Sequence, residues 1–359
     1  MRIPLSQPDV GRNEELMVER TLRSGRLTRG PMVEAFEQQF RDYLGVRHAL
    51  AVSSGTAALH LALLGHGIRQ GDVVLTTPFT FISTANVITY VGARPRFVDI
   101  TRETYDIDPN KIQDSIDSET RALIVVHVFG VPCDMKAITE ICEDHHIVLI
   151  EDACEALGAT YKGNKVGAFG TSCFSFYPNK VVTTAEGGMV CTNDDKVMEM
   201  VDSLRNQGRM GSEWLEHAYV GYNYRLSDVH AAIGIPQLRK VDHANAIREE
   251  KARMYTEALK QYRQVKVPPH VEGRTWFAYV IEVDERDRIG KELNASGIEC
   301  KPYFPPVHLQ VPYRQLGFKE GDFPTCESVS RRALALPFFT KITRSQIRHV
   351  VAAVGRLLK

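Results

Sequence analysis

Three short segments of this 359-residue chain carry residue types that could do chemistry together. The first segment, Ser53–Leu59, directly follows an apolar run that ends at Val52. Within it, Gly55 and Thr56 begin a stretch rich in Ala and Leu. Such a helix start has free N–H groups, a glycine that allows close approach and a nearby hydroxyl, which together favour a bound phosphate. An ordinary capped helix explains the same residues equally well.

The second segment places Asp152 immediately after a strand candidate that includes Ile147–Ile150. Open α/β sheets bind ligands at the carboxyl ends of their strands, so Asp152 lies where a ligand is expected. The alternative is that Asp152 caps a following helix. Asp152, its neighbour and Glu155 also resemble a metal site, but His145 and His146 lie at the other end of the strand, so we expect no metal.

The third segment contains Lys180, in a loop rich in Pro, Asn and Thr between two strand candidates. A single loop lysine is ordinarily a solvated side chain. A strand-end acid, a later lysine and a phosphate-binding turn are, however, the three parts that a pyridoxal phosphate (PLP) site requires. The lysine forms the Schiff base, the acid keeps the pyridine nitrogen protonated, and the helix start binds the 5′-phosphate.

Alternating strands and helices would position these segments. The strand candidates are 49–52, 73–76, 95–99, 122–128, 147–151, 172–177 and 188–192. With intervening helices such as 33–44, they predict an α/β fold with a mostly parallel sheet covered on both faces. From about residue 242 the pattern changes to a long helix (244–262), a strand (276–283), a helix (286–297) and a closing helix from Ser345. We expect a large α/β domain (1–240) and a smaller α+β domain (241–359).

The composition excludes several classes of partner. Lys and Arg number 44, as do Asp and Glu, so no net field attracts nucleic acid or an anionic membrane. The longest apolar runs fall far short of the ~20 residues that cross a bilayer, and the N-terminus lacks a signal-peptide core. Seven scattered cysteines without a CxxC pair indicate reduced thiols. We expect a cytoplasmic protein with no nucleic-acid or membrane partner.

The sequence resembles the DegT/DnrJ/EryC1/StrS family of sugar aminotransferases essentially from end to end. The resemblance is carried by eight segments in family order: 24–31, 54–59, 77–86, 151–153, 174–189, 204–208, 221–228 and 305–308. Each segment alone is a weak signal, whereas the ordered set is specific. It implies a type I PLP fold like that of aspartate aminotransferase, with PLP as cofactor.

The resemblance also implies a role for each matching residue. Lys180 would be the Schiff-base lysine and proton shuttle, and Asp152 would pair with the pyridinium nitrogen. The remaining cofactor contacts would be Phe81 stacking on the ring, Gly55, Thr56 and Ser175 at the phosphate, and Asn223 reaching that phosphate from the neighbouring subunit with Arg225 beside it. This arrangement implies a homodimer with two shared sites. Phe81 as a core residue and Asn223 as a turn residue are the alternatives. Candidate substrate contacts are Thr28, Tyr303, Phe304 and His308.

Glu155 departs from the many family members that carry Gln or His at this position. The position lies near the 3′-oxygen of the cofactor, where an acid would repel the phenolate unless it is protonated or turned away. Members resembling perosamine synthases share this acid, which favours a 4-keto nucleotide sugar as the substrate.

The reaction implied by the resemblance is transfer of an amino group from L-glutamate to a keto sugar, of the nucleotide-linked 4-keto or 3-keto deoxysugar class. Three alternatives remain: a keto-inositol aminotransferase, a PLP-dependent sugar dehydratase, and a non-catalytic regulator that retains the fold. Dehydratase relatives carry His where Lys180 stands, which favours transamination. A regulator need not keep Lys180, Asp152 and Asn223 together.

Overall fold

The computed structural model describes residues 2–210 and 216–358. Within these residues the larger sheet has seven strands in the order β1-β9-β8-β5-β4-β2-β3. Their bounds are β1 (His48–Val52), β2 (Val73–Thr76), β3 (Arg94–Phe97), β4 (Thr120–Val126), β5 (Val148–Asp152), β8 (Thr171–Ser175) and β9 (Gly188–Thr192). The five strands from β8 to β3 run parallel, and β9 is antiparallel to both of its neighbours. The predicted α/β fold with a mostly parallel sheet is confirmed.

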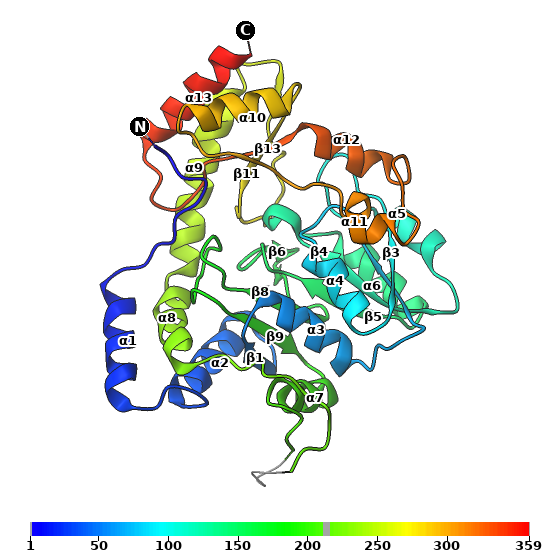
Figure 1. Cartoon of the computed structure of the whole chain (residues 1–359). Coiled ribbons are helices and arrows are strands. Elements are labelled where there is room, and N and C mark those ends of the chain that lie inside the picture. Colours follow the sequence, from blue (N-terminus) through cyan, green and yellow to red (C-terminus); the bar gives the residue numbers. More distant parts are fainter. Residues whose placement is uncertain (1, 211–215, 359) are drawn as a thin grey trace.

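Helices cover both faces of this sheet (Figure 1). Along β4, Leu123 and Val125 pack on one face and Ala122 and Ile124 on the other, as strand geometry requires. The first face carries α2 (Pro31–Leu44), α6 (Met135–Asp144) and α8 (Asp228–Arg239); the second carries α3 (Gly55–Gly65), α4 (Ser83–Tyr90) and α7 (Asp195–Arg205). Because both faces of the sheet are covered, the sequences of its parallel strands are nearly continuous apolar runs.

The C-terminal part forms a second sheet in the order β10-β11-β13-β12. Its strands are β10 (Val265–Lys266), β11 (Tyr279–Val283), β12 (Lys301–Pro302) and β13 (Ala333–Leu336). The helices α9 (Val241–Leu259), α10 (Arg286–Ala295) and α13 (Arg344–Leu357) share a core with it. Ile3 joins this core from the start of the chain, and Figure 1 shows both termini near α13. The domain boundary near residue 240 stays a prediction.

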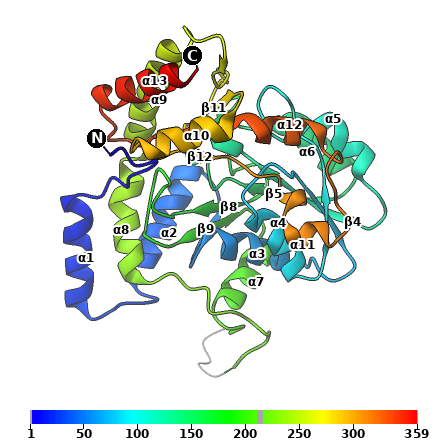
Figure 2. The ribbon, with the colours of Figure 1, turned by 45° about the horizontal axis from the view of Figure 1, so that its top comes forward.

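The remaining elements are short or peripheral. They are α1 (Arg12–Ser24), α5 (Pro109–Ile112), β6 (Thr160–Tyr161), β7 (Asn164–Lys165), α11 (Val311–Arg314) and α12 (Pro324–Arg332). Figure 2 shows α1 lying beside α8, against which it packs. Across residues 2–210 and 216–358, every helix is too short or too polar to span a membrane.

The two sheets are joined by an apolar contact and by one buried carboxylate. Phe79 and Phe129 pack in one cluster with Val280 of β11. Beside this cluster, Glu282 of β11 is 1% exposed and accepts hydrogen bonds from Tyr105 (2.6 Å) and from Arg102 (2.7 Å and 2.6 Å). Lys266 of β10 lies 2.9 Å away. Burial alone would raise the pKa of Glu282, but these donors outweigh it and lower the pKa from 4.5 to about 2.

We predict that Glu282→Gln lowers the free energy of unfolding by about 3 kcal/mol at pH 7, because it removes a buried carboxylate that is stabilised by Arg102, Lys266 and the buried phenol of Tyr105. The folded-state pKa is depressed, so this stabilisation is fully present above pH 4.5 and is lost as the pH falls through about 2. Urea unfolding of both proteins between pH 7 and pH 2 should therefore show the difference shrinking. The exposed control Glu285→Gln should change little, and a pH-independent difference for Glu282→Gln would contradict the assignment.

Candidate active site

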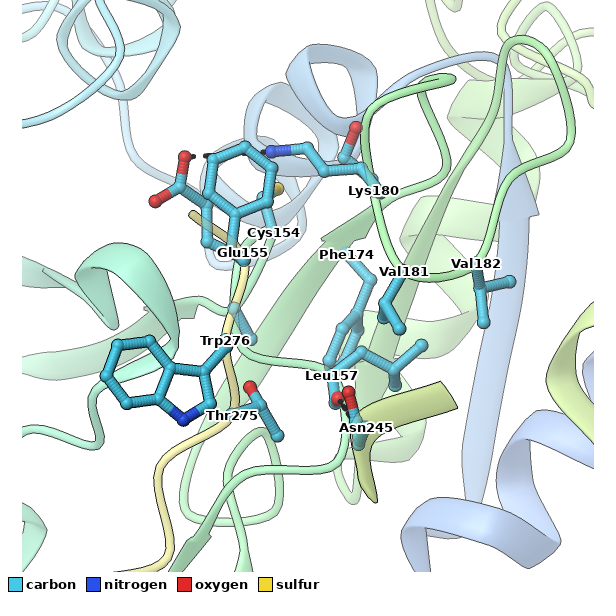
Figure 3. A pocket seen from close by; sticks show the side chains of 13 residues that line it. Cys154, Glu155, Leu157, Phe174, Lys180, Val181, Val182, Asn245, Thr275 and Trp276 are labelled. Atoms are coloured by element: carbon cyan, nitrogen blue, oxygen red, sulfur yellow. Dashed lines mark hydrogen bonds and ion pairs between the residues drawn. The ribbon is translucent and has the colours of Figure 1, made fainter. Parts of the chain in front are cut away.

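Lys180 lies in the loop between β8 and β9, with its side chain turned inward and 13% exposed. Its Nζ atom is 3.8 Å from Oε1 of Glu155 and 4.2 Å from the ring centroid of Phe277. Figure 3 shows the ammonium group and the Glu155 carboxylate facing one another. The alternative of a solvated loop lysine is therefore wrong.

Glu155 follows β5 and presents its carboxylate to this lysine. Its side chain is 10% exposed, and Oε2 accepts a hydrogen bond from the N–H of Phe129 at 2.9 Å. Burial raises the pKa of Glu155, an effect that the Lys180 ammonium and the Phe129 N–H oppose. The pair thus places a basic amine and an acid of weakened acidity in one enclosed space.

Asp152 is the last residue of β5 and accepts two hydrogen bonds. Thr84 Oγ1 donates at 2.7 Å and the N–H of Cys154 at 3.2 Å. No helix begins in residues 153–159, so the helix-cap alternative is wrong. The adjacent Glu151 points to the other side of the strand, where it accepts from three backbone N–H groups: Gly167, Phe169 and Gly170. The carboxylates of Glu151 and Asp152 therefore lie on opposite sides of the strand and accept hydrogen bonds from different donors.

The start of α3 lies against the end of β8. Ser54 caps the helix by accepting from the N–H of Ala57 at 3.0 Å. The N–H groups of Gly55 and Thr56 have no hydrogen-bond acceptor among the described residues. A Cβ atom at Gly55 would lie 2.8 Å from Cβ of Ser175 and 3.0 Å from Sγ of Cys154. Gly55 is thus required by close packing, and the position that its Cβ atom would take lies 3.3 Å from the Ser175 hydroxyl oxygen.

Phe81 is 62% exposed, whereas Phe79 is fully buried. The alternative that Phe81 belongs to the core is therefore wrong, and its ring is available to a ligand.

Asn223 and Arg225 belong to a segment that runs past the end of β1. Asn223 is exposed and pairs with Asn206, whose side chain accepts from Arg225 at 3.1 Å. Burial and the charges of Arg29 and Arg209 lower the pKa of Arg225. These contacts leave Asn223 facing outward, and its predicted role at a second subunit stays a prediction.

The four candidate substrate contacts lie in different surroundings. Thr28 is exposed and pairs with Ser227. Tyr303 stacks on Phe129, and burial together with Glu155 raises its pKa to about 12. Phe304 is buried among Phe79 and Phe129. His308 is fully buried, with Nε2 3.1 Å from Oε1 of Glu327. Tyr303 is thus the one of the three loop residues whose pKa is affected by Glu155, and substrate contact by all four stays a prediction.

Sequence reasoning missed three residues that shape the site: Phe277, Phe129 and Thr84. Phe277 and Phe129 come from segments distant in sequence and carry no local motif. Thr84 lies inside the matched segment 77–86, and its place one helical turn after Thr80 was an available signal, because the two hydroxyls and Asp152 form one chain of hydrogen bonds.

This donor set fits PLP. A largely buried lysine can bind an aldehyde covalently, and a strand-end carboxylate can pair with a ring nitrogen. A helix start with two N–H groups that find no partner in residues 2–210 and 216–358 can bind a phosphate. The glycine that leaves room at this helix start supports the fit.

Comparison with known proteins agrees with this geometry. The sequence model of the DegT/DnrJ/EryC1/StrS aminotransferase family matches residues 8–355. The chain is 38% identical over 367 residues to GDP-perosamine synthase of Caulobacter vibrioides, covering 99% of this chain and 98% of that protein. The chain belongs to this aminotransferase family. The resemblance inferred from the eight segments is confirmed.

Solved structures of the family share the fold. DesV of S. venezuelae, in complex with a ketimine intermediate, superposes with a TM-score of 0.92 at 34% identity, over 96% of this chain and 94% of that chain. The PLP form of the sugar aminotransferase Spr1654 from Streptococcus pneumoniae gives 0.95 at 27% identity, over 100% and 99%. The chain is therefore an aminotransferase with the type I PLP fold.

We predict that Gly55→Ala destabilises this family member by about 1–3 kcal/mol, because the added methyl group overlaps Ser175 and Cys154. Denaturant unfolding of the cofactor-free protein measures the effect. The double variant Gly55→Ala/Ser175→Gly should recover part of the loss, since it removes the nearer of the two contacts. Equal stability of Gly55→Ala and the parent would show that the helix start is not held against β8.

Proposed function

We propose that this protein is a PLP-dependent aminotransferase that moves an amino group from L-glutamate to a nucleotide-linked 4-keto, or 3-keto, deoxysugar. The observation that carries the proposal is the convergence of buried Lys180 with Asp152, Glu155 and the helix start at Gly55. Similarity to GDP-perosamine synthase supports a nucleotide-linked sugar as the amino acceptor.

Four parts of the site would hold the cofactor. Lys180 would anchor its aldehyde, and Asp152, fixed by Thr84 and Cys154, would pair with its ring nitrogen. The Gly55 and Thr56 N–H groups, the Thr56 hydroxyl and the Ser175 hydroxyl would bind its phosphate, and Phe81 would cover its ring. Once bound, the cofactor supplies an electron sink that acidifies the carbon bearing the amino group.

The chain's own residues would then move the proton. Lys180, released as a neutral amine, would take the proton from the donor carbon that bears the amino group and deliver it to carbon C4′ of the bound cofactor, as general base and then acid. With the keto sugar it would move a proton in the reverse direction. Phe277 and Phe129, both buried, would exclude water from this transfer. Glutamate and the keto sugar would use the same site in turn, which gives ping-pong kinetics.

A homodimer with shared sites completes the proposal. Asn223 is exposed, and the Arg225 guanidinium near it donates a hydrogen bond to the Asn206 side chain. Both are thus available to the phosphate of a cofactor held by a second copy of the chain.

The proposed function predicts a particular pair of half-reactions. Protein loaded with PLP and treated with glutamate should release 2-oxoglutarate. After glutamate is removed, the same protein should aminate a 4-keto nucleotide sugar. The substrate panel also includes 3-keto sugars and keto-inositol. Lys180→Ala should lose both half-reactions, whereas the exposed-lysine control Lys196→Ala should keep them. Mass spectrometry of the products measures each step. Amination of keto-inositol alone, loss of water from the sugar, or no turnover would each contradict the proposal.

The shared-site arrangement predicts complementation between two inactive variants. A mixed dimer of Lys180→Ala and Asn223→Ala subunits has one site with both residues intact and one with neither. Random mixing of equal amounts should therefore restore up to about one quarter of the parent activity. Activity is measured after denaturation and joint refolding, with each variant refolded alone as the control. Hybrids as inactive as the separate variants would place Asn223 in its own subunit's site.

A further inference from the structure

The carboxylate of Glu155 depends on Lys180 for its charge compensation. One oxygen accepts from the Phe129 N–H at 2.9 Å, and the other lies 3.8 Å from the lysine Nζ atom. The side chain is 10% exposed. A carboxylate removed from water is costly unless it is paired, so its ionised form relies on the adjacent ammonium group.

The other ionisable groups near Glu155 do not supply the positive charge that Lys180 provides. Asp152 carries the same sign of charge and has its own two donors, Thr84 and Cys154. The phenol of Tyr303 has a pKa of about 12 and is neutral near pH 7. When Lys180 gives up its positive charge, Glu155 is therefore left as an uncompensated buried carboxylate beside a second acid.

We propose that Glu155 is the proton acceptor of Lys180 when the lysine binds an aldehyde covalently, and that it remains a neutral acid while the lysine is so bound. This inference rests on the proposed function, which supplies the aldehyde. The lysine nitrogen forms a double bond to the aldehyde carbon, whose oxygen leaves as water with two of the three ammonium protons. The third proton passes to the Glu155 carboxylate, and no electrons are gained or lost overall.

The transfer keeps the charge of the site balanced in both states. In the cofactor-free protein, the site holds an ammonium–carboxylate pair. With Lys180 bound, it holds a neutral acid and leaves Asp152 as the carboxylate that faces the cofactor ring. When the bond to the aldehyde is instead hydrolysed, water supplies two of the three ammonium protons and Glu155 returns the third to Nζ. Glu155 is thus a proton store for the lysine, and a glutamine in its place has no proton to exchange.

Infrared difference spectroscopy tests this inference. The spectrum of PLP-loaded minus cofactor-free protein should gain the carbonyl stretch of a protonated carboxylic acid, and that band should shift in D₂O. Glu155→Gln should lose the band, and Glu155→Asp, which keeps an acid, should retain it at a shifted position. Glu186→Gln, an exposed acid in the same loop as Lys180, is the matched control and should keep the parent band.

Borohydride reduction and peptide mass spectrometry on each sample separate this inference from the proposed function. An adduct on Lys180 without the acid band in the parent protein, or with the band unchanged in Glu155→Gln, overturns the role of Glu155 alone. The absence of an adduct on Lys180 in the parent overturns the proposed function and this inference with it. If Glu155→Gln does not fold, the Glu155→Asp spectrum decides, since an unshifted band excludes this residue.

Discussion

The ion pair between Lys180 and Glu155 forms because three loops meet at one edge of a parallel sheet. Parallel strands end on the same side, so the segments after β4, β5 and β8 bring Phe129, Glu155 and Lys180 together. Neither charge would remain buried without the other. The doubly covered sheet therefore holds the Lys180 amine and the Glu155 carboxylate 3.8 Å apart and largely shielded from water.

The antiparallel strand β9 connects this pair to the helix start at Gly55. Because β9 lies between β1 and β8, the loop carrying Lys180 must turn back over the end of β8 before the chain returns beside β1. Gly188, the first residue of β9, allows this return: a Cβ atom there would lie 2.4 Å from the carbonyl oxygen of Ser54. The lysine loop and the candidate phosphate cradle are thus positioned by one close backbone contact.

Local patterns sufficed to predict the strands of the large sheet to within about two residues. They also singled out Asp152 at a strand end, Gly55 at a helix start and Lys180 in the loop between two strands. They could not predict Phe277, which reaches Lys180 from the second sheet, since that contact depends on how the two sheets pack. For the same reason, the sequence placed His308 and Phe304 in a loop but did not predict that both side chains are buried. Whether such a side chain faces a ligand or the core is decided by tertiary packing.

Three acids within five residues show how the fold assigns different chemistry to the same functional group. Glu151 accepts from three backbone N–H groups and holds the loop of residues 167–170, so its oxygens are occupied. Asp152 has two donors on its own side of the strand, and its remaining lone pairs would be available to the ring nitrogen of the proposed cofactor. Glu155 has one N–H donor and a lysine whose charge depends on its covalent state. The number of fixed hydrogen-bond donors therefore falls from Glu151 to Asp152 to Glu155. Glu155, which has the fewest, is the acid best suited to gain and lose a proton.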